Sequence, residues 1–459
     1  MDKAAKIFAS VFYDKKFYGV MLKIALPVMI QNFISSLLNM IDTVMVGKLG
    51  EIEIAAVGIA NQYFFFFHMF IIGLCAGCSV FISQFWGKGD TKNIKRILGI
   101  GLISASIFSL VFMVLGYLNP GKVIALFTHD PLVIDSGARY LSIVLISYIF
   151  TGITFVYSFA LRSTGQATQP MVVSAVALIL NVFFNYVLIF GNLGAPRMGV
   201  AGAALATVIA RVVETAILVI YVYRGKSVLA ATFKEMTDVT WGFAKKSYLT
   251  IFPVILNEIN WATASLIYVA VYGRMGTQAV AAIQICNTIS NLFLVVIFGM
   301  ATAASVMVGH SIGAGKEELA HDYAQKFSVL SVVVGMGFGL LLALTSPLIL
   351  NSFNVSATVR TNSLYILYII SLIFCIRALG IMFIIGILRG GGDAARALMI
   401  EGFTLWFIGV PLTILGAFVF HLPVFLVYSL SILEEIAKCV MSFYRLRSGK
   451  WINNVTQKM

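Results

Sequence analysis

The side chains best suited to chemistry in this chain are a carboxylate and three neutral oxygen donors inside long apolar segments. At similar depths in three such segments lie Asp42, Asn181, Asn185 and Thr207. Each is about five to ten residues from the end of its segment, which in a helix is a depth of roughly 8–15 Å. Carboxylate, amide and hydroxyl oxygens are ligands that a hard cation prefers. The same group can instead share or hold a proton on Asp42.

A polar stripe leads to Asp42. Gln31, Ser35 and Asn39 precede it at successive spacings of 4, 4 and 3, which places them all on one face of a helix. That face should line a cavity or meet polar groups of neighbouring helices, and Gln31 and Asn39 are candidates to contact substrate. The alternative is a hydrogen-bonded packing network. Because a charge inside a membrane helix costs about 2.5–3.5 kcal/mol, Asp42 favours an ion or proton site.

A second acid, Glu258, lies near the middle of another apolar segment, with Asn257 beside it. We expect Glu258 to bind substrate or a second proton. The other charge at that depth, Arg377, has three alternative roles: counter-ion to Glu258, repulsion of the wrong substrate, or pairing with backbone carbonyls. Two further sets of charges are expected to form structural ion pairs: Arg211 with Glu214, and Glu434 and Glu435 with Lys438.

Membrane-spanning helices must position these residues. The chain of 459 residues is 60% apolar and 11% charged, with a mean hydropathy of +0.96, which is too little charge for the surface of a soluble protein. Its apolar runs are long enough to cross a hydrocarbon layer roughly 30 Å thick, and a helix satisfies its own backbone there. We predict an all-α integral membrane protein with twelve transmembrane helices: 20–46, 54–82, 97–118, 138–160, 169–191, 198–222, 247–272, 280–308, 325–350, 362–388, 396–418 and 423–445.

The two halves of the chain match each other at a fixed spacing of 226 residues. Corresponding pairs include Pro27 and Pro253, Gly47 and Gly273, Gly73 and Gly299, and Gly87 and Gly313. Two apolar repeats suggest a transporter whose substrate passes between them. The acids are not repeated, because Tyr268 corresponds to Asp42 and Asn32 to Glu258. We predict three parts: an N-terminal lobe over 1–223, a cytoplasmic linker over 224–246 and a C-terminal lobe over 247–459.

The basic residues indicate an orientation. With a cytoplasmic N-terminus, 23 of the 32 Lys and Arg residues lie on the inner side. The outer side has six: Lys48, Lys122, Arg139, Arg197, Arg274 and Arg360. We therefore expect a multi-pass protein of the cell's inner or plasma membrane with both termini in the cytoplasm. The net charge of +13 mostly reflects this asymmetry, and the sequence shows no soluble basic module for nucleic acid.

Enzymatic classes are disfavoured. No nucleotide-binding loop is present, so direct use of ATP is not expected. Cys75 and Cys78 have redox-like spacing but lie within an apolar segment without a thioredoxin context. The histidines are scattered and show no metal-ligand or triad pattern: His68, His129, His310, His321 and His421. We predict that the protein is not an enzyme and needs no cofactor.

Short motifs in both halves recur in one transporter family. The first helices of the halves contain Pro27-x4-Asn32 and Pro253-x4-Glu258, and the run Asp42-Thr43-Val44-Met45-Val46-Gly47 ends the first of them. Other motifs are Gln84-Phe85-Trp86-Gly87-Lys88-Gly89-Asp90, Leu161-Arg162-Ser163-Thr164-Gly165-Gln166 and its echo Leu388-Arg389-Gly390-Gly391-Gly392-Asp393. Over nearly its whole length the chain closely resembles the multidrug and toxic compound extrusion (MATE) family, in its bacterial NorM-like branch.

The resemblance implies two pseudo-symmetric six-helix lobes forming a V, and efflux of organic cations or drugs in exchange for Na⁺ or H⁺ by alternating access. The residues that match the family's N-lobe cation site are Asp42, Asn181, Asn185 and Thr207. Glu258 matches an acidic position of the NorM-like branch. That branch has another acid eleven residues before the arginine of the Leu-Arg-Gly motif, where this chain has Ala378. The resemblance thus leaves Glu258 to act alone or with Arg377.

A flippase for lipid-linked oligosaccharide or polysaccharide is the closest alternative, since related folds do that work. It would favour a strongly basic cavity, whereas acids outnumber bases more than three residues from the ends of the predicted helices. The bases are Arg211, Arg377 and Lys438, and the acids are Asp42, Glu214, Glu258, Glu401, Glu434 and Glu435. This balance favours small cationic drugs or metabolites as cargo. We expect a monomer in the lipid bilayer.

Overall fold

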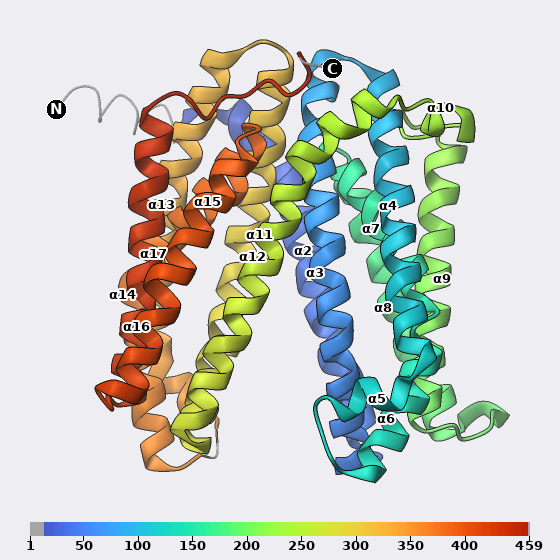
Figure 1. Cartoon of the computed structure of the whole chain (residues 1–459), viewed down its shortest axis with the longest axis vertical. Coiled ribbons are helices and arrows are strands. Elements are labelled where there is room, and N and C mark those ends of the chain that lie inside the picture. The colour runs from blue at the N-terminus through green and yellow to red at the C-terminus, as the bar shows by residue number, and fades with distance from the viewer. Residues whose placement is uncertain (1–12, 354, 458–459) are drawn as a thin grey trace. The chain divides into compact units, whose positions relative to one another are not determined.

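The computed structural model describes residues 13–353 and 355–457, and the regular structure in them is helical throughout (Figure 1). Short helices and 3₁₀ or π segments connect or interrupt the long ones. In chain order the elements are α2 (Lys15–Gly47), α3 (Glu51–Lys88), α4 (Thr91–Leu118), α5 (Pro120–Ala125), α6 (Pro131–Val144), α7 (Ser147–Ser163), α8 (Thr168–Phe190), η1 (Asn192–Gly194), α9 (Val200–Arg224), α10 (Phe233–Thr237), α11 (Trp241–Met275), α12 (Thr277–Gly313), α13 (Glu317–Asn351), α14 (Ala357–Ile381), η2 (Met382–Leu388), α15 (Ala394–Thr404), η3 (Leu405–Gly409), α16 (Val410–Ile414), η4 (Leu415–Val419) and α17 (Val424–Arg447).

Each of the twelve predicted segments coincides with a long helix or with a run of consecutive helical elements. Within the described residues, ten helices are long and apolar enough to cross a membrane, or eleven if the bent pair α6 and α7 is one span. The last predicted segment forms α17. It falls short of that apolar character because Glu434, Glu435 and Lys438 lie in its middle.

The fourth predicted segment, 138–160, is not one straight helix. It is divided between α6 and α7, which meet at an angle of 51°. Between them the amide of Ile146 donates to the carbonyl of Ile143, three residues earlier. Such shorter bonds tighten the chain and change its direction. The apolar pattern of a segment does not indicate a bend of this kind, so the prediction from sequence did not include it.

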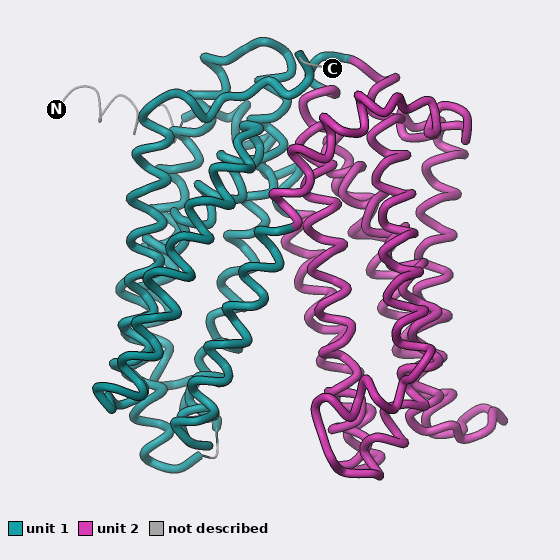
Figure 2. The backbone as a smooth tube through the Cα atoms, viewed as in Figure 1, with its two compact units in different colours: residues 1–26, 87–89, 256–459 teal, residues 27–86, 90–255 magenta. Residues whose placement is uncertain are grey.

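The chain divides into two compact units (Figure 2). The N-terminal unit, as we name it, consists of residues 27–86 and 90–255. The C-terminal unit consists of residues 1–26, 87–89 and 256–459.

In the N-terminal unit, α8 packs along α9, α4 along α7, and α6 against α9. A Cβ atom at Gly202 of α9 would lie 2.5 Å from the carbonyl oxygen of Leu188 in α8. Glycine at this position therefore permits the close approach of the two helices. Because α8 carries Asn181 and Asn185, and α9 carries Thr207, this contact brings together three of the four predicted cation ligands.

In the C-terminal unit, α12, α13 and α14 pack together, and α17 packs on α14. A Cβ atom at Gly335 of α13 would lie 2.7 Å from the Cα of Cys375 in α14, so small residues again set the helix spacing. Three π-helical segments, η2, η3 and η4, interrupt the α-helices of this unit. π-helical turns shift the side chains that follow them out of regular α-helical register.

Candidate functional site

Asp42 lies at the end of a chain of hydrogen bonds that crosses three helices. The amide nitrogen of Asn185 donates to Asp42 Oδ1 at 2.5 Å and to Asn181 Oδ1 at 2.9 Å. Asn181 in turn donates to Thr207 Oγ1 at 3.5 Å, and this hydroxyl donates to the carbonyl of Ala203 at 3.1 Å. The structure thus brings together all four residues of the predicted cation or proton site.

The same cluster has an oxygen without a partner. Asn181 and Asn185 stand one turn apart on α8 and are each only 1% exposed. The side-chain oxygen of Asn185 is buried and accepts no hydrogen bond. A buried polar atom left unpaired costs about 1–3 kcal/mol. A cation at this position would use that oxygen together with Asp42, so the residues present fit a cation.

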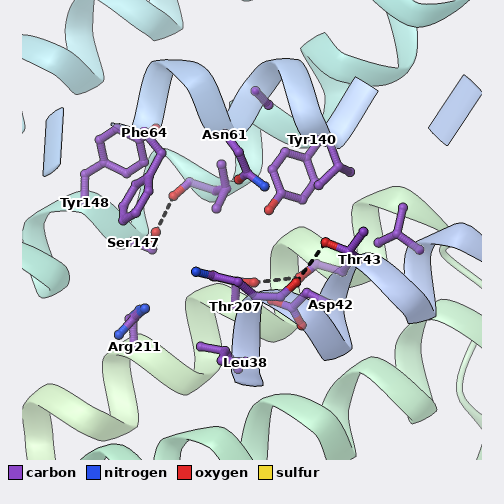
Figure 3. A pocket seen from close by; sticks show the side chains of 16 residues that line it. Leu38, Asp42, Thr43, Asn61, Phe64, Tyr140, Ser147, Tyr148, Thr207 and Arg211 are labelled. Atoms are coloured by element: carbon purple, nitrogen blue, oxygen red, sulfur yellow. Dashed lines mark hydrogen bonds between the residues drawn. The ribbon is translucent and has the colours of Figure 1, made fainter. Parts of the chain in front are cut away.

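A small cavity opens beside Asp42 (Figure 3). Its volume is about 70 Å³, which is enough for an ion with a few waters and well below the roughly 300–1,000 Å³ of drug-sized sites. Thr207 lines it, and so does Asn39, which was predicted to contact substrate. Asn61 and Tyr140 line it too, and sequence reasoning missed both. Their signal was weak, because each is a single polar group in a segment rich in aromatic or aliphatic residues.

Arg211 also lines this cavity, and its charge is compensated. Arg211 Nη1 lies 2.7 Å from Glu214 Oε2, which is the predicted structural pair. The other oxygen of Glu214 accepts a hydrogen bond from Ser174 at 3.0 Å. Gln31 donates to the hydroxyl of Ser174 at 2.9 Å and accepts from Arg162 Nη2 at 2.6 Å. Gln31, predicted to contact substrate, is therefore held in a polar network and is not among the residues that line this cavity.

Glu258 has an ionic partner that the sequence did not indicate. Arg389 Nη1 lies 2.6 Å from Glu258 Oε1, and the side chains are 7% and 15% exposed. Arg389 belongs to the Leu-Arg motif of the second half, and Arg162 belongs to that of the first. Each motif arginine therefore contacts the first helix of its own half, at Glu258 and at Gln31.

The other predicted residues of the C-terminal unit belong to a separate charged cluster. Asn257 donates to Glu401 Oε2 at 2.6 Å, and Glu401 lies 3.5 Å from Lys438. Arg377 Nε lies 4.0 Å from Glu435 Oε1. Of the three roles considered for Arg377, the structure shows an ion pair, but with Glu435 instead of Glu258. The predicted pairing of Lys438 with its neighbours on α17 is present, at 2.7 Å from Glu434 and 3.8 Å from Glu435.

Asp42 differs from the other acids in the predicted helices. Within the described residues, five of these acids have a basic partner within 4.0 Å: Glu214, Glu258, Glu401, Glu434 and Glu435. Asp42 has none, and its hydrogen-bond donor is the neutral amide of Asn185. The described residues also contain no group of three or more His, Cys, Asp or Glu that could hold a metal ion. A single uncompensated carboxylate with neutral oxygens suits a monovalent cation or a proton.

Comparisons with known proteins agree with this architecture. The chain is 26% identical over 432 residues to a probable multidrug resistance protein NorM of Thermotoga maritima, covering 94% of this chain and 92% of the relative. It is 24% identical over 410 residues to the multidrug resistance protein MdtK of Edwardsiella ictaluri, covering 85% and 86%.

Solved structures show the same fold. A MOP superfamily transporter from Pyrococcus furiosus matches with a TM-score of 0.85 and 19% identity over 95% of this chain and 96% of that one. A multidrug resistance MATE family transporter in an outward-facing conformation matches with the same TM-score, identity and coverage. The predicted helical transporter fold is confirmed. The MatE family model matches residues 27–187 and 253–415, which is most of the chain, and the protein therefore belongs to the MatE family of membrane transporters.

Proposed function

We propose that this protein is a secondary active antiporter that exports organic cations or drugs and takes its energy from Na⁺ or H⁺ bound at Asp42. The observation that carries the proposal is that, in the described part of the chain, the Asp42 carboxylate has no basic partner within 4.0 Å and accepts its hydrogen bond from a neutral amide. Burying an uncompensated carboxylate is costly. A bound Na⁺ or proton removes that cost, so the occupied and empty forms of the site differ strongly in energy.

That difference is what coupling requires. An ion can shift a conformational equilibrium only by as much as it prefers one state over another. The Asp42 cavity favours an ion in the state where Asn185, Asn181 and Thr207 converge on the carboxylate. A rearrangement that separated α8 or α9 from α2 would remove those ligands and release the ion. Cargo then moves in the opposite direction during the same cycle of alternating access.

These four residues would hold the coupling ion. Asp42 would supply the charge, and Asn181, Asn185 and Thr207 the neutral oxygens. Arg211 shares the cavity, but Glu214 holds its guanidinium at 2.7 Å. We further propose that both termini and the linker over 224–246 face the cytoplasm, on the basis of the distribution of Lys and Arg.

Proteoliposomes with imposed gradients test the proposal. Purified protein is reconstituted, and efflux of a fluorescent organic cation is followed under a Na⁺ gradient at constant pH and under a pH gradient without Na⁺. Asp42→Asn keeps the size and hydrogen-bonding capacity of the side chain but removes its charge, so gradient-driven transport should be lost. Glu51→Gln, an exposed acid at the start of α3, is the matched control. Uphill efflux by Asp42→Asn at the wild-type rate would overturn the assignment.

A further inference from the structure

The C-terminal unit contains a second cavity that is much larger than the one at Asp42. Its volume is about 390 Å³, compared with about 70 Å³ for the first. Drug-sized ligands occupy sites of roughly 300–1,000 Å³. The second cavity therefore has room for an organic molecule, whereas the first has room for an ion.

The internal repeat relates the two cavities. Residues that line the first have counterparts 226 positions later that line the second, and they come from the first two helices of each half. The pairs include Asn39 and Ser265, Asp42 and Tyr268, and Asn61 and Asn287. An accidental packing gap would not reproduce this correspondence. The second cavity is thus the duplicated form of the first, with altered size and chemistry.

The carboxylate has changed helices between the two copies. In the first cavity the acid is Asp42, on the first helix of its half, and the last helix contributes Arg211. In the second cavity Tyr268 stands at the Asp42 position, and its hydroxyl donates to Glu434 Oε2 at 3.0 Å. Glu434 and Glu435 both come from α17, the last helix of the half. The second cavity therefore also contains a carboxylate, but this carboxylate comes from the last helix of the half instead of the first.

The charges around the second cavity do not balance. Lys438 lies 2.7 Å from Glu434 but 3.5 Å from Glu401 and 3.8 Å from Glu435. Arg377 lies 4.0 Å from Glu435, which is a loose contact for an ion pair. Three carboxylates thus share two basic side chains, so the fully ionised group has a formal charge of −1. Glu435 meets both bases only at 3.8 and 4.0 Å, beyond hydrogen-bond distance, and it lines the cavity.

Aromatic rings complete the lining: Trp261, Tyr268, Tyr272 and Tyr428. The face of an aromatic ring attracts a cation and offers apolar surface to the rest of a ligand. We propose that this cavity binds a monovalent organic cation whose charge lies at Glu435 and whose apolar body lies against these rings. The choice of an organic cation as ligand rests on the export function proposed above.

Direct binding to the full-length purified protein tests this site without any gradient. The probe is tetraphenylphosphonium, a monovalent aromatic cation, titrated by calorimetry. Glu435→Gln should weaken binding about tenfold or more, because the compensating charge is lost in a cavity where water screens poorly. Ser265→Leu fills the cavity without changing a charge and should weaken binding as well. Glu318→Gln, exposed on α13, is the control with expected wild-type affinity.

Two results would overturn the inference. Wild-type affinity in both folded variants, Glu435→Gln and Ser265→Leu, would show that the probe binds elsewhere. Equal affinity of the wild-type protein for a zwitterion of the same aromatic bulk would show that the cavity does not select a net positive charge. Neither result depends on ion coupling, so failure of this proposal can be distinguished from failure of the Asp42 proposal, which is tested separately in proteoliposomes.

Discussion

Replacing Asn185 by leucine tests whether the amide beside Asp42 is an ion ligand. The side chain makes two hydrogen bonds, to Asp42 Oδ1 at 2.5 Å and to Asn181 Oδ1 at 2.9 Å. Its own oxygen is buried and unpaired. Leucine has a similar volume, so α8 should remain packed on α9. The substitution therefore removes one potential neutral oxygen ligand and the two bonds that hold it in place.

The expected effect depends on the coupling ion. If Na⁺ is bound, loss of one neutral oxygen should weaken its binding by roughly 1–2 kcal/mol, which is about 5–30-fold in the Na⁺ concentration that half-activates transport. If the cluster serves only a proton on Asp42, Na⁺ should have no effect on either protein. The variant should then alter the dependence of transport on pH instead. One substitution thus distinguishes the two coupling modes.

The assay is initial-rate efflux of a fluorescent organic cation from proteoliposomes, with Na⁺ varied at fixed pH and then pH varied without Na⁺. Tyr186→Leu is the control, because Tyr186 is the next residue on α8 and its side chain is 51% exposed. Insertion and folding are checked by monodispersity and thermal unfolding. If Asn185→Leu responded to both ions as the wild type does, the ligand argument would be refuted and only the packing role would remain.

The other predictions concern charges outside the Asp42 cavity. Glu258→Gln should lower the melting temperature, because Arg389, 2.6 Å away, keeps a buried charge without its partner, a loss of up to about 3–5 kcal/mol. Adding Arg389→Gln to this variant should recover much of the lost stability. If Glu258→Gln instead kept the wild-type melting temperature and bound cationic substrates more weakly than neutral ones, Glu258 would be assigned to cargo. In the linker, the hydrogen bond from Lys95 and then that from the backbone of Thr232 lower the pKa of Glu235 from 4.5 to about 2. A lowered pKa in the folded state stabilises the protein above about pH 4.5, and this contribution is lost as pH falls toward 2. Glu235→Gln should therefore lower the melting temperature at pH 7 and less so near pH 3, and an equal decrease at both would contradict the argument.

The parts of this protein that could be predicted from sequence depend on spacing along helices. The stripe that ends at Asp42 and the pair Asn181 and Asn185 follow from helical periodicity. The common depth of these residues follows from counting along apolar segments whose length the membrane sets. These local rules identified the four residues that the structure brings together. The family was identified by its sequence motifs and the helical fold by the long apolar segments, and the comparisons confirm both.

Contacts between distant segments could not be predicted in this way. Arg389 lies in a motif that follows the tenth predicted helix, and no spacing rule relates it to Glu258 on α11. The same holds for Asn257, which donates to Glu401 across 144 residues of sequence. The bend between α6 and α7 depends on hydrogen bonds that do not alter the apolar pattern. Each of these features arises from tertiary packing, which composition and periodicity do not encode.

The structure distinguishes the acids that have a basic partner from Asp42, the acid that we propose binds the coupling ion. A motif arginine contacts the first helix of each half, at 2.6 Å in both cases, but its partner is the neutral Gln31 in one and Glu258 in the other. The repeat thus preserves the arginine contact but changes its partner from a neutral amide to a carboxylate. The charge of Glu258 is compensated by Arg389, while Asp42 on the corresponding helix accepts a hydrogen bond from the neutral amide of Asn185. A duplicated scaffold in which one half keeps an uncompensated acid in an ion-sized cavity, and the other a drug-sized cavity, can assign coupling and cargo to different halves.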